Sequence, residues 1–233
     1  FVIDYKNTLR CYFINDGSEC WNVQTEGSFT LSNTKTSLIL VDNKIIFNNS
    51  VGEITALNIE TGMLLWQLPT QSSNIIYETY NFQTSELVSD ENSIYFSNNK
   101  NEFYSIDVNS GSINWINKIN SNISPIIIEN LIFTVSNEGF LFVIEKNNGN
   151  IIRITDAYIQ YNKKNRSEIK PIGFAIGNKN LYLTNSDGKI IIIDLSLGDI
   201  IKIEKVSGNL VSKPLIFKNN LYLIRNGKID KYN

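Results

Sequence analysis

Histidine is absent from this sequence of 233 residues. The absence removes the usual general base near neutral pH and the commonest metal ligand. It also excludes serine–histidine and cysteine–histidine nucleophilic chemistry within the chain. We therefore expect no catalytic residue, no metal-binding residue and no cofactor.

Strong charge and long apolar runs are missing as well. The formal net charge is −2, which gives no electrostatic reason to expect nucleic acid as a partner. The short basic run KKNR, Lys163 to Arg166, is interpreted as a solvated loop. No apolar run is long enough to span a bilayer, and no signal peptide is visible. Because the chain opens on Phe1 and not on Met, we expect membrane contact only through a lost N-terminal lipid anchor.

Cysteine occurs twice, as Cys11 and Cys20, at matched distances from a predicted tight turn. If Phe13 pairs with Ser18, the two thiols lie opposite each other on one face of a hairpin. A disulfide forms in an oxidising compartment, although cross-strand bridges are often strained. Two free thiols that pack as small hydrophobic groups fit the sequence as well.

A short glycine-centred pattern is present five times, and its central residues are Gly17, Gly62, Gly111, Gly149 and Gly198. Ten residues before each of them stands a second residue that accepts a positive φ, in turn Asn7, Gly52, Asn101, Gly139 and Gly188. Gly227 begins a sixth copy. Glycine and asparagine adopt the left-handed conformation at low cost, so each unit is predicted to contain two tight turns.

Strand-like apolar runs lie between these turns, for example KIIFNNS (44–50) and NLYLTNS (180–186). Each unit is predicted to form four short antiparallel strands, A to D, and no helix of any length is expected. Units of 38 to 49 residues with four strands are typical of a β-propeller. We expect one all-β propeller domain over 1–233, with blades near 1–25, 30–70, 84–120, 123–158, 170–207 and 211–233. The first and last blades are incomplete, so the parent protein is expected to have seven or eight.

The repeat reads Ala/Ser-Leu/Ile-Asp/Asn-x-x-x-Gly-x-x-x-Trp, and it resembles the repeat of quinoprotein-like (PQQ-like) β-propellers. Three copies keep the tryptophan, as Trp21, Trp66 and Trp115, and the last two carry Arg153 and Lys202 in its place. The resemblance implies that these tryptophans pack between neighbouring blades. The aliphatic stems of Arg153 and Lys202 are expected to fill the same slot and to send their charges outward.

The position four residues before the central glycine carries an oxygen acceptor in four copies, as Asn58, Asp107, Glu145 and Asp194, whereas the first copy has Phe13. We interpret these side chains as acceptors for backbone N–H groups inside the turn. A ring of cation ligands is disfavoured, because the carboxylates would lie on separate blades.

The final segment, SKPLIFKNNLYLIRNGKIDKY, is similar to the end of the BamB-type lipoproteins of the outer-membrane β-barrel assembly machinery. That resemblance implies a non-enzymatic protein-interaction scaffold in the bacterial periplasm or at the outer membrane. Its partner would be the periplasmic domains of the barrel insertase. The alternatives are a dehydrogenase dependent on pyrroloquinoline quinone and calcium, and a ligand-sensing ectodomain of a larger receptor.

Two long D–A connections, near 68–84 and 155–170, are the candidate partner-binding loops. The candidate partner-binding residues in them are Tyr77, Tyr80, Phe82, Tyr158, Tyr161 and Arg166. Tyrosine and arginine are favoured at protein interfaces, so we expect an exposed contact patch on the face that carries these loops. In the alternative interpretation, the loops fold back and cap the propeller.

Overall fold

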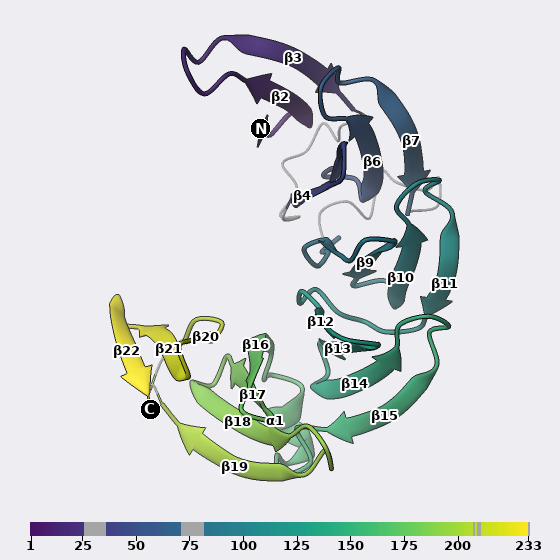
Figure 1. Ribbon diagram of the computed structural model, residues 1–233. Coiled ribbons are helices and arrows are strands. Elements are labelled where there is room, and N and C mark those ends of the chain that lie inside the picture. The colour runs from purple at the N-terminus through teal and green to yellow at the C-terminus, as the bar shows by residue number, and fades with distance from the viewer. Residues whose placement is uncertain (26–35, 71–81, 207, 209–210, 233) are drawn as a thin grey trace. The chain divides into compact units, whose positions relative to one another are not determined.

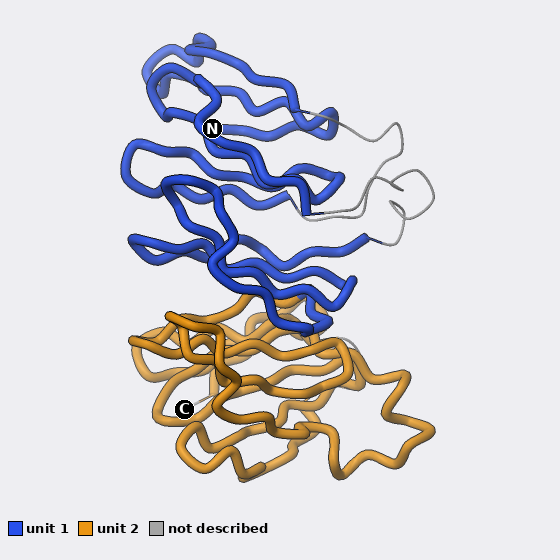
Figure 2. The backbone as a smooth tube through the Cα atoms, turned by 90° about the vertical axis from the view of Figure 1, so that its right-hand side faces the viewer, with its two compact units in different colours: residues 1–122 blue, residues 123–233 orange. Residues whose placement is uncertain are grey.

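The computed structural model describes residues 1–25, 36–70, 82–206, 208 and 211–232. The chain divides into two compact units, residues 1–122 and 123–233 (Figure 2). Each unit contains three antiparallel sheets in its described residues. We number the sheets 1 to 6 in chain order. Across the described ranges, no helix has the length and apolar character needed to cross a membrane.

Unit 1 contains sheets 1 to 3. Sheet 1 consists of β1 (Val2–Ile3), β2 (Thr8–Tyr12) and β3 (Glu19–Gln24). Sheet 2 consists of β4 (Leu38–Val41), β5 (Lys44–Asn48), β6 (Glu53–Asn58) and β7 (Leu64–Pro69). Sheet 3 consists of β8 (Val88–Ser89), β9 (Ser93–Asn98), β10 (Glu102–Asp107) and β11 (Ile113–Asn117).

Unit 2 contains sheets 4 to 6. Sheet 4 consists of β12 (Ile126–Ile128), β13 (Leu131–Val135), β14 (Phe140–Glu145) and β15 (Ile151–Asp156). Sheet 5 consists of β16 (Pro171–Gly177), β17 (Asn180–Asn185), β18 (Lys189–Asp194) and β19 (Ile200–Lys205). Sheet 6 consists of β20 (Leu215–Phe217), β21 (Asn220–Arg225) and β22 (Lys228–Tyr232). These sheets follow one another from teal to yellow in Figure 1.

The predicted order of four antiparallel strands per sequence repeat is confirmed, because each strand pairs with its neighbour in the chain. Sheet 1 begins at the B position and sheet 6 ends at the C position, so the first and last sheets have three strands each and are incomplete, as predicted. The structure differs from the prediction at α1 (Lys163–Arg166), where a solvated loop was expected. Asn162 caps this single helical turn by accepting a hydrogen bond from the Asn165 amide at 2.9 Å.

The two tight turns predicted for each sequence repeat have the expected backbone conformation. The residues with positive φ include Gly17, Gly62, Gly111, Gly149 and Gly198 in the C–D turns. They also include Asn7, Gly52, Asn101, Gly139, Gly188 and Gly227 in the B–C turns. The spacing of glycine and asparagine therefore predicted the path of the backbone correctly.

The inner strands are apolar on both faces because each sheet packs against neighbours within its unit. Phe47 and Ile45 in sheet 2 lie in a cluster with Leu9 of sheet 1. On the opposite face of sheet 2, Ile54 lies in a second cluster, with Phe96 of sheet 3. All five side chains are fully buried. This two-sided burial explains why the B and C strands read as nearly continuous apolar runs.

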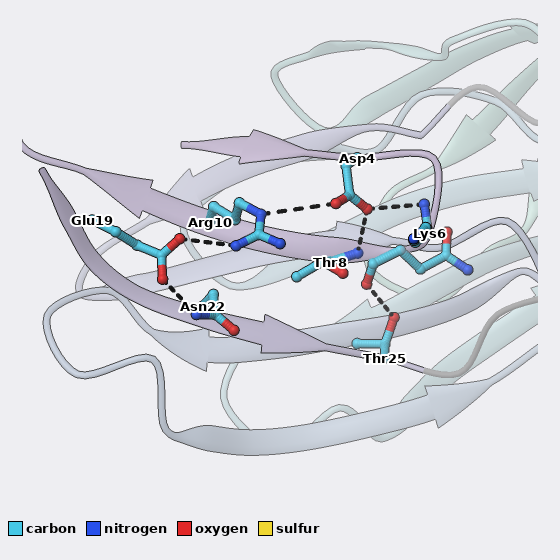
Figure 3. Close-up of polar contacts among 8 residues, drawn as sticks. Asp4, Lys6, Thr8, Arg10, Glu19, Asn22 and Thr25 are labelled. Carbon is cyan, nitrogen blue, oxygen red and sulfur yellow. Dashed lines mark hydrogen bonds and ion pairs between the residues drawn. The ribbon is translucent and has the colours of Figure 1, made fainter. Parts of the chain in front are cut away.

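The B–C turn of sheet 1 shows how polar side chains complete these hairpins (Figure 3). The Asp4 carboxylate accepts hydrogen bonds from the backbone N–H groups of Lys6 and Thr8, at 2.9 and 3.0 Å. Arg10 lies between two carboxylates, at 3.8 Å from Asp4 and 2.9 Å from Glu19. The turn therefore begins with a side chain that accepts backbone N–H groups, as Asn49 does in sheet 2.

Candidate functional site

The side chains of Asn58, Asp107 and Asp194 accept backbone N–H groups of their own C–D turns. Glu145 instead accepts from the Asn148 side-chain amide at 2.7 Å. The Asn58 Oδ1 atom accepts the N–H groups of Glu60 and Thr61, both at 3.0 Å. The Asp107 carboxylate accepts from the Ser110 amide at 2.7 Å, and these hydrogen bonds lower the pKa of Asp107 below its usual value. The structural interpretation of these positions is confirmed for both residues. In the part of the chain that the structure describes, no cluster of three or more histidine, cysteine, aspartate or glutamate side chains could hold a metal ion.

Two motif tryptophans dock onto the C–D turn of the next sheet. The Trp66 indole N–H donates to the Val108 carbonyl at 2.9 Å, and that of Trp21 donates to the Ile59 carbonyl at 3.2 Å. A Cβ atom on Gly111 would lie 2.6 Å from the Trp66 ring. Gly111 is therefore needed for its left-handed backbone and also for the space that the ring fills.

Trp115 belongs to the same motif, and its ring contacts lie partly within its own sheet. Its ring stacks on Phe103 with 5.9 Å between centroids and lies 6.1 Å from the ring of Tyr95. These contacts add an aromatic cluster to one face of sheet 3.

Arg153 replaces the tryptophan in sheet 4, and its position corrects the expectation that its charge points outward. Its guanidinium donates to the carbonyls of Leu195 and Ser196, at 2.6 and 2.7 Å. Leu195 corresponds to Val108 in the repeat, so arginine binds the same turn that tryptophan binds elsewhere. Lys202 differs, because its exposed ammonium group pairs with Glu204 at 2.7 Å.

The structure joins Cys11 and Cys20 in a disulfide with 5.2 Å between Cα atoms. The simple pairing expected for the two cysteines was wrong, because Cys11 lies opposite Trp21 and a β-bulge follows. The bulge leaves Cys20 beside Trp21, where it still reaches Cys11. The same positions in sheet 3 hold Ser105 and Asn114, which are joined by a hydrogen bond of 3.2 Å.

The predicted contact residues have different outcomes. Tyr77 and Tyr80 lie outside the described residues. Phe82 and Tyr158 are fully buried, which contradicts the expectation that they are exposed. Each ring packs over the glycine of a B–C turn, Phe82 over Gly52 and Tyr158 over Gly139. Because these glycines have no Cβ, each leaves a space that the buried aromatic ring fills.

Tyr161 and Arg166 are partly exposed and help to hold the loop of residues 157–170 against sheets 4 and 5. The Tyr161 hydroxyl donates to Asp187 at 3.0 Å, and the Arg166 guanidinium pairs with Asp156 at 2.7 Å. Burial, with Asp187 as a further cause, raises the pKa of Tyr161, so its hydroxyl remains a proton donor. In this second D–A loop, the side chains expected to form a contact patch act instead as a cap.

A polar hollow of about 430 Å³ lies between this loop and sheet 5, and Asn165 of α1 is part of its lining. The label α1 marks this part of the loop in Figure 1. Its lining includes Tyr161 and Glu168 from the loop, Asp187 from the B–C turn, and Lys189 and Lys205 from β18 and β19. We did not predict the two lysines from the sequence. The available signal was Lys189, which directly follows the positive-φ residue of its B–C turn. At that position sheets 2 and 3 have Glu53 and Glu102. The outer side of this loop, together with the hollow, is the candidate interaction surface.

Comparisons with known proteins place the sequence in a family. A family model described as outer membrane protein assembly factor BamB matches residues 1–155 of the chain. No curated protein matches the sequence. The chain is similar in fold to the crystal structure of BamB from Moraxella catarrhalis, with a TM-score of 0.75 and 15% identity over 98% of this chain.

Two other solved structures are similar at lower identity. One is the C-terminal WD40 domain of Sif2, with a TM-score of 0.68 and 12% identity over 98% of this chain. The other is the Cps50 (Swd1) β-propeller domain of Myceliophteria thermophila, with a TM-score of 0.61 and 11% identity over 81% of this chain. The chain spans 67% of the length of the Moraxella protein, 61% of the Sif2 domain and 60% of the Cps50 domain. These likenesses show the β-propeller fold, and the family match extends over more than half of the sequence. The chain therefore belongs to the family of the outer membrane protein assembly factor BamB.

Proposed function

We propose that this protein is a non-enzymatic interaction scaffold in the assembly of outer-membrane β-barrel proteins. The family match over residues 1–155 carries the proposal, because the family is described by that assembly process. Its partner is a protein, and the periplasmic domains of the barrel insertase are the first candidate. The predicted single propeller domain is the framework that would present the binding loops.

The disposition of the polar side chains supports a scaffold better than an enzyme. Asn58 and Asp107 are occupied by turn backbone, and Arg153 by two carbonyl groups. The chain contains no histidine that would act as a general base. A quinone- and calcium-dependent enzyme would instead require acidic and amide ligands that converge on one point.

The disulfide supports a location in the periplasm. Cys11 and Cys20 are joined in sheet 1, and such bonds persist in oxidising compartments, which include the bacterial periplasm. A periplasmic or outer-membrane-associated protein of this family would fold where that bond forms.

The test is a calorimetric titration of the full-length protein with the soluble periplasmic domains of the barrel insertase from the same bacterium. We expect saturable binding that weakens in Ile159→Ser, because Ile159 is 68% exposed on the D–A loop of residues 157–170. Leu197→Ser is the matched control, since Leu197 is 71% exposed at a C–D turn. The absence of heat and of co-elution with those domains would refute the proposed partner.

A further inference from the structure

The B–C turn of sheet 5 differs from its counterparts in the way it uses its asparagine. In sheet 2, Asn49 accepts the backbone N–H of Glu53 at 3.0 Å and donates its amide N–H to the Glu53 carboxylate at 3.0 Å. In sheet 3, Asn98 donates to the Glu102 carboxylate at 2.9 Å. Each of these two asparagine amides therefore has a carboxylate acceptor four residues further along its own chain.

Sheet 5 has no such carboxylate, because the corresponding residue is Lys189. Asn185 is fully buried, and its Oδ1 atom accepts a hydrogen bond from the Tyr158 hydroxyl at 2.6 Å. Its Nδ2 atom has no hydrogen-bond partner among the described residues. A buried donor without an acceptor is costly, so this turn lacks a group that its relatives contain.

The same replacement also places two positive charges opposite each other. Lys189 and Lys205 are direct cross-strand partners in sheet 5, whereas the corresponding pair in sheet 2 is Glu53 and Pro69. Like charges at opposed positions destabilise a sheet. Asp187 neutralises Lys189 at 3.0 Å, but Lys205 is exposed and forms no ion pair within the described residues. An anion beside Lys205 would supply the counter-charge that this lysine lacks.

The surroundings of the hollow are positive although the chain as a whole is negative. Lys163 and Lys164 precede Asn165 in the chain, and Lys170 follows Ile169; Asn165 and Ile169 both line the hollow. The three lysines are exposed, and none of them forms an ion pair with another described residue. Glu168 is exposed on the same loop and carries a negative charge that offsets part of this positive charge. This local excess would attract an acidic group and orient it as it approaches.

We infer that this hollow binds a carboxylate side chain from an acidic segment of a protein partner. The carboxylate binds Lys189 and Lys205, which both line the hollow, and gives this turn the negative charge that Glu53 and Glu102 give theirs. The buried Asn185 does not line the hollow and is not a ligand of the carboxylate. The Tyr161 ring forms one wall, held by the Asp187 hydrogen bond and by the Lys189 ammonium group 4.6 Å above it. A recessed site of this size suits a side chain better than the flat, multiply charged surface of a membrane. The inference rests on the proposed function as an interaction scaffold and names the chemistry of the partner.

The experiment measures binding of a fluorescein-labelled peptide of alternating glutamate and serine by anisotropy, with the glutamine–serine peptide as its uncharged counterpart. We expect the glutamate peptide to bind about tenfold or more tightly than its counterpart, as charge-assisted hydrogen bonds require. Lys205→Glu should abolish this preference and raise the melting temperature, because the introduced carboxylate pairs with Lys189 across the strands. Opposite changes in binding and stability distinguish an occupied site from a damaged fold.

Lys118→Glu is the matched control, since Lys118 is exposed, lies in unit 1 and undergoes the same change of charge. It should retain most of the binding, and Lys189→Gln should lose it. Equal binding of both peptides, or wild-type binding by Lys205→Glu, would overturn the inference. Lys205-dependent capture by phosphatidylglycerol vesicles without peptide binding would overturn it in favour of a membrane surface.

The same variant separates this inference from the proposed function. If the insertase domains bind Lys205→Glu as tightly as the wild type, the scaffold stands and the hollow is not its contact. If the glutamate peptide binds through Lys205 and the insertase domains do not bind, the hollow stands and the proposed partner is wrong.

Discussion

The C–D turns of the two units are held in chemically different ways. In unit 1, Trp66 buries an indole against Gly111 and makes one hydrogen bond to the Val108 carbonyl. In unit 2, Arg153 reaches the corresponding turn and makes two hydrogen bonds, to Leu195 and Ser196. The repeat therefore requires a long side chain that donates to the carbonyl after the Asp/Asn position, and either residue type satisfies that requirement.

The difference concerns where the stabilising free energy comes from. Trp66 is 9% exposed, so its contribution is mainly the burial of a large apolar surface. Arg153 is half-buried, and its Nε atom is buried without a hydrogen-bond partner. Its contribution comes from charge-assisted hydrogen bonds, less the cost of removing the guanidinium from water.

Truncation of these two side chains should give the largest effect and the clearest test of the comparison. Trp66→Ala is expected to lower the free energy of unfolding by about 3–5 kcal/mol, because it removes a buried aromatic side chain and leaves a cavity. Arg153→Ala should cost about 1.5–3 kcal/mol, the amount typical of hydrogen bonds to a charged group. Urea denaturation followed by circular dichroism measures both values.

Arg153→Lys is the control for the hydrogen-bonding geometry. Lysine keeps the charge but cannot donate to two carbonyls with a planar fork, so it should recover only part of the loss. Equal losses for Trp66→Ala and Arg153→Ala would mean that both docks depend on the shared hydrogen bond and not on apolar burial.

The disulfide of sheet 1 is expected to give a smaller effect, and it extends the comparison to a third hairpin. Replacement of Cys11 by Ser and Cys20 by Asn introduces the pair found as Ser105 and Asn114 in sheet 3. We expect a loss of about 2–3 kcal/mol from the opened short loop, offset by about 1 kcal/mol if the new hydrogen bond forms.

The measurement is urea denaturation of the wild type and the double variant, each with and without dithiothreitol. The reductant should destabilise only the wild type. Equal stability of the oxidised and reduced wild type would show that the bulged hairpin needs no covalent link.

The sequence predicted the hairpins well because a positive φ is accessible to few residue types, and Gly and Asn therefore mark each turn. It failed for Phe82 and Tyr158, since burial of their rings depends on slots above Gly52 and Gly139 in earlier hairpins. Composition alone cannot reveal such a slot, and an aromatic residue in a long loop resembles an interface residue. The charge of the hollow was missed for a similar reason, because Lys189 and Lys205 become neighbours only through strand register.

The smallest effect concerns pH and distinguishes two turns that receive tryptophan. The turn that binds Trp21 is closed by Asn58, and the turn that binds Trp66 is closed by Asp107. Hydrogen bonds from Ser110 lower the pKa of Asp107 in the folded state. Its stabilisation is therefore fully present above the unfolded pKa of about 3.9 and is lost as the pH falls from there through the lowered folded pKa. Asp107→Asn should keep the turn, as Asn58 does, and should remove this part of the acid sensitivity. Urea midpoints between pH 6 and about pH 3 should then converge or cross in favour of the variant below about pH 4. Parallel curves would mean that the turn does not depend on the ionised form of Asp107.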